Sequence, residues 1–103
     1  MFVVMNRFSV KPEFADQFAA RIRNRPGQVE KQPGFIRVQL LRPANAGDPY
    51  IVLTLWKTQA HFEAWVNHPD FTRKHAGPRR LSKDIFRGPN HVETFTVILD
   101  STN

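Results

Sequence analysis

The sequence predicts an α+β domain with the element order β-α-β-β-α-β, in which helices cover one face of a four-stranded antiparallel sheet. Three observations lead to this prediction. Stretches typical of strands occur at residues 2–10, 35–42, 50–56 and 91–99, and the first two of them alternate between apolar and polar residues. Helical spacing of apolar residues follows the first and the third of these stretches. A turn-rich loop joins the two middle strands. This order is the ferredoxin-like arrangement, and it predicts one domain over residues 1–103.

The first strand carries a polar residue on its apolar face. Alternation over residues 2–10 places Phe2, Val4, Phe8 and Val10 on one side, and Asn6 falls on the same side. A buried amide without a partner costs a few kcal/mol, roughly 1–3 by mutational data. We therefore expect Asn6 either to be satisfied within the sheet or to point into a pocket.

The first helix is expected over residues 13 to about 25, after Pro12, since proline suits a first helical turn. Its apolar stripe consists of Phe14, Phe18 and Ile22. Arg21 and Arg25 form a second pair at i, i+4, displaced from that stripe. These arginines could reach carboxylates beyond the helix, and the alternative is a pair of solvated side chains.

The middle strands form a hairpin, with Ile36, Val38 and Leu40 expected on one face of the first. The second, residues 50–56, is apolar on both faces, with Ile51, Leu53 and Leu55 on one side and Val52 and Trp56 on the other. A strand covered on both sides needs a second layer beyond its own helices. The uncovered apolar face therefore predicts a homodimer in which two sheets meet.

The second helix begins after Thr58 and presents Phe62, Trp65 and Val66 to the sheet or to a pocket. His68-Pro69 ends it, because a residue before proline is driven out of the α region. A short helix should follow from Asp70, with Phe71 and His75 on one side. The chain thus holds an indole and an imidazole on two helices joined by a kink.

Composition excludes several classes of protein. The absence of cysteine excludes a disulfide framework, a thiolate metal site and a cysteine nucleophile. No apolar run approaches the roughly 20 residues of a membrane span, and no signal-peptide pattern opens the chain. We therefore expect a cytoplasmic protein without a membrane partner. The formal net charge of +6 suggests an acidic partner, or simply a solvated basic surface. A nucleic-acid partner is not expected, since interleaved aromatic and basic residues are missing.

The usual catalytic signatures are absent. There is no Walker loop, GxGxxG, HExxH or GxSxG motif. His61, His68 and His91 lie on or beside segments expected to be exposed, and only His75 shares an apolar helix face. A lone histidine of this kind is often structural. One imidazole is too few for zinc, but it is enough for haem, whose iron a single proximal histidine can hold.

The chain resembles the IsdG-type haem-degrading monooxygenases. These belong to the antibiotic-biosynthesis-monooxygenase superfamily, whose members are dimeric α/β barrels. The resemblance runs over nearly the whole chain, and it is carried by these segments: VVMNRF with Asn6, EKQPGF, QLLRP, WKTQAHFEAW ending at Trp65, and DFTRKHAGPR with His75.

The resemblance implies roles for individual residues. His75 would be the axial ligand of the haem iron, and the Asn6 amide would face the distal side and donate a hydrogen bond to iron-bound oxygen species. Trp65 would press on the haem and hold it out of plane, so that a meso carbon comes within reach of the activated oxygen. Haem would be both substrate and cofactor, with its iron released, O₂ a co-substrate and an external donor or reductase supplying electrons.

Basic residues receive supporting roles by the same resemblance. Arg21 and Arg25 match arginines on the helix that flanks the pocket, and Ile22 occupies a position where an aromatic can occur. Arg79, with the basic 79–87 segment, could neutralise the haem propionates, and the alternative is a solvated loop. The proline and glycine at 26 and 27 depart from the family pattern.

The resulting hypothesis is a haem-degrading monooxygenase. Two other functions stay open: a cofactor-independent monooxygenase of the same superfamily acting on an aromatic or polyketide substrate, and a non-catalytic haem-binding protein. The sequence leaves undetermined the tetrapyrrole product, the position of ring opening, the release of carbon monoxide or formaldehyde, and the electron donor.

Overall fold

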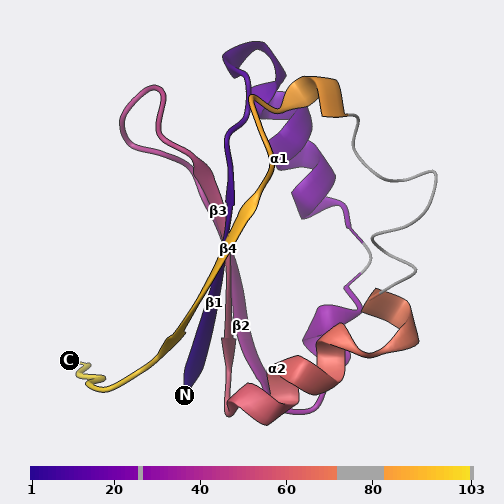
Figure 1. Cartoon of the computed structure of the whole chain (residues 1–103), viewed down its shortest axis with the longest axis vertical. Helices are drawn as coiled ribbons and strands as arrows, with labels where there is room; N and C mark the ends of the chain where they lie inside the picture. Colours follow the sequence, from indigo (N-terminus) through magenta and orange to yellow (C-terminus); the bar gives the residue numbers. More distant parts are fainter. Residues whose placement is uncertain (26, 72–82, 103) are drawn as a thin grey trace.

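The computed structural model describes residues 1–25, 27–71 and 83–102. It confirms the predicted sheet, in which four antiparallel strands lie in the order β2-β3-β1-β4. The strands are β1 (Phe2–Phe8), β2 (Phe35–Leu41), β3 (Tyr50–Trp56) and β4 (His91–Thr96). Helices α1 (Ala15–Arg23) and α2 (Gln59–Val66) both lie on one face, over opposite ends of the strands (Figure 1).

The first helix is shorter than expected. A 3₁₀ turn, η1 (Pro12–Phe14), precedes it, and α1 runs only from Ala15 to Arg23. The predicted stripe is nevertheless correct, because Phe18 is fully buried and Phe14 and Ile22 pack against the same cluster. Another 3₁₀ turn, η2 (Val29–Lys31), follows and buries Val29.

The second helix is capped as predicted. The Thr58 hydroxyl accepts a hydrogen bond from the backbone N–H of His61 at 3.2 Å, which satisfies a free donor of the first turn. Gly34 lies against this turn with a φ of 80°, and a Cβ there would collide with the His61 ring. Its carbonyl accepts from Lys57 N–H at 2.8 Å, which ties the start of β2 to the end of β3.

The expected face of β2 is wrong at one residue. Phe35 pairs with Trp56 and Arg37 pairs with Leu55, so Ile36 is the extra residue of a bulge. The bulge reverses the alternation at its position: Phe35 packs on Trp56 with ring centroids 5.8 Å apart, and Ile36 is 40% exposed.

Two other strands, β1 and β4, end earlier than predicted. β1 ends at Phe8, and Val10 forms only an isolated bridge with Phe86. β4 ends at Thr96, and beyond it Ile98 and Leu99 are 95% and 82% exposed. The 3₁₀ turn η3 (Lys83–Ile85) lies in the basic segment for which a solvated loop was one expectation, yet its Ile85 is 2% exposed and packs beneath α1.

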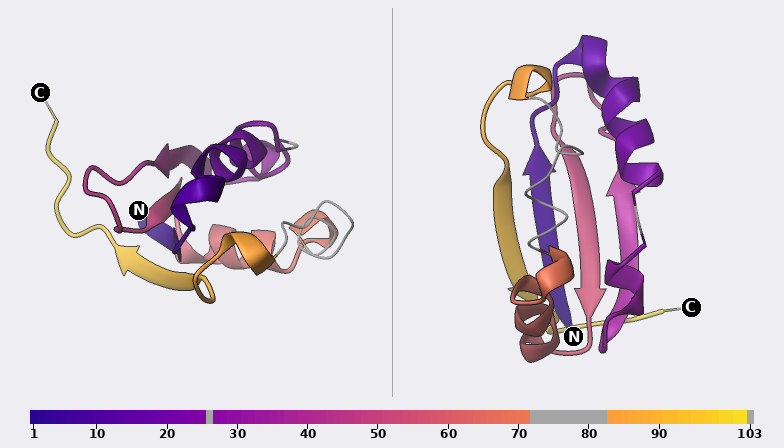
Figure 2. Two further views of the ribbon diagram at one scale, coloured as in Figure 1. Left: turned by 90° about the horizontal axis from the view of Figure 1, so that it is seen from above. Right: turned by 90° about the vertical axis from the view of Figure 1, so that its right-hand side faces the viewer.

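The buried side chains form two clusters rather than one. The first, beneath α2, contains Phe2, Val4, Val29, Trp56 and Trp65. The second, beneath α1, contains Phe18, Tyr50 and Ile85. Figure 2 shows why, since the helices cover the two ends of the sheet. Among the described residues, no helix is long and apolar enough to cross a membrane.

Candidate functional site

The candidate site lies between the two clusters, on the face of the sheet that carries the helices. Asn6 is centrally placed there, because β1 pairs it with Val52 of β3 and with Val92 of β4. Paired residues point to the same face of an antiparallel sheet. Asn6 is half-buried, and Val92 is 51% exposed. The described residues therefore leave the row formed by Val52, Asn6 and Val92 partly exposed to solvent.

Asn6 is satisfied on one side only. Its Oδ1 accepts a hydrogen bond of 2.9 Å from Nδ2 of Asn90, just before β4. Its own Nδ2 donates to no described residue. One end of the amide is thus fixed within the protein, as one expectation for Asn6 had it, and the N–H donors at the other end have no partner among the described residues.

Trp65 is positioned by aromatic packing. It is 5% exposed, and its ring meets Phe71 edge-on with a centroid distance of 5.6 Å. His68 lies on another side, 5.9 Å away. Trp65 is therefore first a core residue, and only a small part of its surface can reach a ligand.

The arginines of α1 differ in their freedom. Arg25 is tied down, because Nη2 pairs with Glu30 and Nη1 donates to the Ile22 carbonyl at 3.0 Å. Arg21 is half-buried and makes no hydrogen bond or ion pair with a described residue. Ile22 itself packs toward the second cluster. Arg21 is thus the more available cation.

Two predicted site residues, His75 and Arg79, lie outside the described residues. His68, expected on or beside an exposed segment, is partly exposed: its Nδ1 accepts a hydrogen bond from Asp70 N–H at 3.0 Å, and its ring lies 5.9 Å from that of Trp65. The part of the chain that the structure describes holds no cluster of three or more metal-ligating side chains. A group held by a single histidine remains compatible with this finding.

Sequence reasoning missed three residues of this region: Asn90, Glu30 and Val92. Asn90 belongs to no motif of the sequence, yet its side chain fixes the Asn6 amide. The only signal was indirect, since pairing residues 91–96 with the first strand brings the preceding residue near Asn6. Nothing in the sequence indicates that Glu30, rather than another carboxylate, pairs with Arg25.

The chemistry of this region suits a flat, largely apolar ligand with a few polar groups. Val52 and Val92 offer apolar contact on either side of Asn6, whose N–H can donate a hydrogen bond. Arg21, on α1, has no partner among the described residues, and its guanidinium can pair with a carboxylate. A porphyrin with its propionates has these properties.

Comparison with known proteins identifies similar chains. The Antibiotic biosynthesis monooxygenase family matches residues 1–77. A mycobilin-producing haem oxygenase of Mycobacterium tuberculosis is 35% identical over 98 residues, covering 95% of this chain and 90% of that protein. A staphylobilin-producing haem oxygenase of Staphylococcus haemolyticus is 31% identical over 86 residues, covering 82% of each.

The same likeness holds in three dimensions. The structure of the haem degrader MhuD from Mycobacterium tuberculosis, with two haems bound in its active site, matches with a TM-score of 0.81 at 31% identity. The match covers 99% of this chain and 100% of that one.

Proposed function

This chain belongs to the antibiotic biosynthesis monooxygenase family, and we propose that within it the chain acts as a haem-degrading monooxygenase. It is similar over most of its length to two haem oxygenases. The observation that carries the proposal is the half-buried Asn6 amide, which is fixed at Oδ1 and free to donate from Nδ2 in a partly open apolar row.

In this proposal, haem is the substrate and supplies the iron and the ring carbon that is oxidised, while O₂ and external electrons complete the reaction. Asn6 orients the reaction by donating a hydrogen bond on one side of the ring. The exposed edge of Trp65 bounds the site, and Arg21 holds a propionate. His75 is proposed as the axial ligand and Arg79 as a second propionate contact. Iron release and a cytoplasmic location stay predictions.

The test is a haem titration of the purified full chain, followed by turnover. We expect a saturable Soret shift, loss of the axial-ligand signature in His75→Ala, and an open-chain tetrapyrrole by mass spectrometry once reductant and O₂ are supplied. An unsaturable spectrum would refute haem as the substrate and favour the cofactor-independent monooxygenase. Haem that binds but persists under turnover conditions would make the protein a haem-binding protein.

We further propose that the functional unit is a homodimer joined through the other face of the sheet. The register of the strands places an apolar group on that face: Val3, Met5, Ile51, Leu53, Leu55 and Phe95. Phe95 is 44% exposed and Leu41 37% exposed in the single chain. A second sheet would cover this surface and remove it from water.

A neighbouring pair of substitutions tests the dimer. Phe95→Glu places a charge on the open face, whereas Thr96→Glu places the same charge one residue on, facing the helices. Sedimentation equilibrium should show a dimer for wild type and Thr96→Glu and a monomer for Phe95→Glu. A dimeric Phe95→Glu variant would contradict the proposed interface.

A further inference from the structure

Two further basic side chains, Arg23 and Arg42, line a cavity on the side of α1 opposite to Arg21. This cavity, of about 280 Å³, is lined by Ala19, Arg23, Leu40, Arg42 and Tyr50. Residues two apart on an α-helix point about 200° away from each other. Arg23 therefore faces away from Arg21, and this cavity, which Asn6 does not line, is separate from the proposed haem site.

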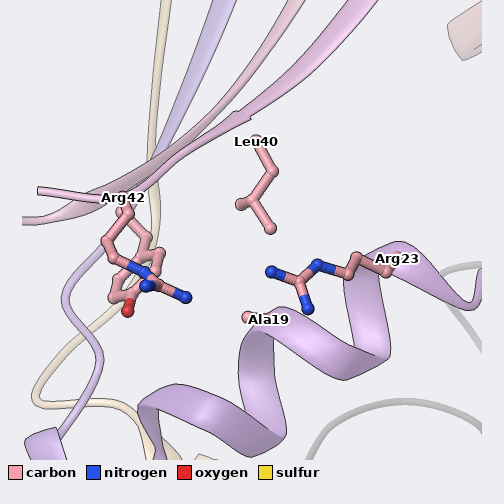
Figure 3. Close-up of a pocket in the computed structure, with 5 residues that line it drawn as sticks. Ala19, Arg23, Leu40 and Arg42 are labelled. Atoms are coloured by element: carbon pink, nitrogen blue, oxygen red, sulfur yellow. The ribbon is translucent and has the colours of Figure 1, made fainter.

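The two arginines of this cavity converge. Figure 3 shows the side chains of Arg23, from α1, and Arg42, just after β2, pointing toward one another, with Leu40 and Ala19 on the walls. Neither guanidinium makes a hydrogen bond or ion pair with a described residue, whereas Arg7 and Arg25 pair with Glu93 and Glu30. Two unpaired like charges that face one space repel each other, and an anion between them would replace this repulsion with attraction.

Tyr50 supplies the third polar group of this cavity, and core packing holds its ring in place. Tyr50 is 8% exposed, and its ring meets that of the fully buried Phe18 at 5.5 Å with an interplanar angle of 67°. Its hydroxyl donates to no described residue. The cavity is thus lined by the Tyr50 hydroxyl, which core packing holds in place, and by the exposed guanidinium groups of Arg23 and Arg42.

We propose that this cavity binds a small dicarboxylate. A guanidinium matches a carboxylate through two parallel N–H···O bonds, and guanidiniums that enter from opposite sides suit a ligand with a carboxylate at each end. Ala19 and Leu40 give apolar contact for a short carbon chain between them. The volume lies at the lower end of the range for ligand pockets, roughly 300 Å³, which excludes a tetrapyrrole.

The experiment is calorimetric titration of the full chain without haem, at pH 7 and constant ionic strength, with succinate as the probe. Succinate should bind saturably. Butyrate keeps the carbon chain and loses one carboxylate, so it should bind at least about tenfold more weakly, the lower limit for a hydrogen bond to a charged group. Equal binding of the two probes, or no saturable binding of succinate, would overturn the proposal. Tighter binding of inorganic phosphate would overturn the dicarboxylate assignment.

Variants locate the site. Arg23→Gln and Arg42→Gln change exposed side chains, so the fold should be kept, as circular dichroism can verify. Each should weaken succinate binding at least about tenfold. Lys57→Gln removes the same charge from an exposed position beyond the opposite end of β3, and it should leave the affinity unchanged. If Lys57→Gln weakens binding as much as Arg42→Gln, the effect is one of net charge and the site is refuted. Because haem is absent, failure here leaves the proposed function untouched.

Discussion

Nδ2 of Asn90 donates a 2.9 Å hydrogen bond to Oδ1 of Asn6, and this contact joins residues 84 positions apart in the sequence. It fixes which end of the Asn6 amide faces the candidate site. We expect Asn90→Ala to retain haem and to slow its degradation about two- to tenfold, which corresponds to one hydrogen bond of roughly 0.5–1.5 kcal/mol. Single-turnover absorbance measurements would show the difference.

Asn67→Ala is the control for this prediction, because Asn67 also donates to a carbonyl but caps α2 at the surface. It should degrade haem at the wild-type rate. Asn6→Ala should be slower than Asn90→Ala, since it removes the donor itself. A wild-type rate in Asn90→Ala together with a slow Asn6→Ala would show that the contact has no part in orientation.

Trp65 should contribute mainly to stability. Trp65→Ala removes a side chain that is 5% exposed and packed on Phe71, so it should lower the free energy of unfolding by about 3–5 kcal/mol. Val92→Ala changes a half-exposed residue and should cost less than about 0.5 kcal/mol. Urea denaturation of the apoprotein measures both values. A loss of unfolding free energy below about 1 kcal/mol for Trp65→Ala would contradict the assignment of Trp65 as a core residue.

If haem binds as proposed, Glu30 competes with its propionates for Arg25. The pair is partly exposed, with side-chain exposures of 18% and 44%, and such a pair is worth at most about 1 kcal/mol. Glu30→Gln should release the guanidinium toward a propionate and tighten haem binding by up to about fivefold. Glu63→Gln, which removes the same charge from α2, should change nothing. Equal tightening in both variants would point to net charge alone.

The Arg7–Glu93 pair predicts a dependence of stability on pH. The hydrogen bond from Arg7 lowers the pKa of Glu93, aided by the charges of Arg7 and His91 and opposed by burial. Because folding favours the ionised carboxylate, this stabilisation is present above the usual value of 4.5 and is lost as the pH falls through the lower pKa of the folded state.

Urea midpoints of wild type and Glu93→Gln between about pH 6 and pH 3 measure this effect, because the stabilisation is lost as the pH falls from above 4.5 through the lower pKa of the folded state. Wild type should be the more stable protein at the upper end, and the difference should shrink as the pH falls. A difference that does not change with pH would mean that the pair makes no net electrostatic contribution.

The sequence was informative wherever periodicity carried the signal. Strand alternation located Asn6 on the apolar face, and helical spacing located Phe18 in the core. The bulge at Ile36 was not predictable, because the single inserted residue leaves a strand-like composition intact. Ile85 was missed because Ile85 and Phe86 form a short apolar pair among basic and turn residues, without strand or helix periodicity, and only tertiary packing buries Ile85.

The candidate site could be predicted only in part. Helical spacing singled out Trp65 and an exception to strand alternation singled out Asn6, and their roles in the site stay predictions. Their partners depend on contacts between segments far apart in the chain, as with Asn90, or on a choice among several carboxylates, as with Glu30. His75 lies outside the described residues, so its role remains a prediction.

Because the core consists of two separate clusters, residues in the middle of the sheet can be substituted during evolution more easily than residues inside one continuous core. One cluster anchors α2 and the other anchors α1, so neither depends on the residues at Asn6 and Val92. Mutations there can alter which molecule is recognised without loss of folding. Descendants of one ancestral chain could therefore diverge in chemistry while the frame that holds both helices stayed the same.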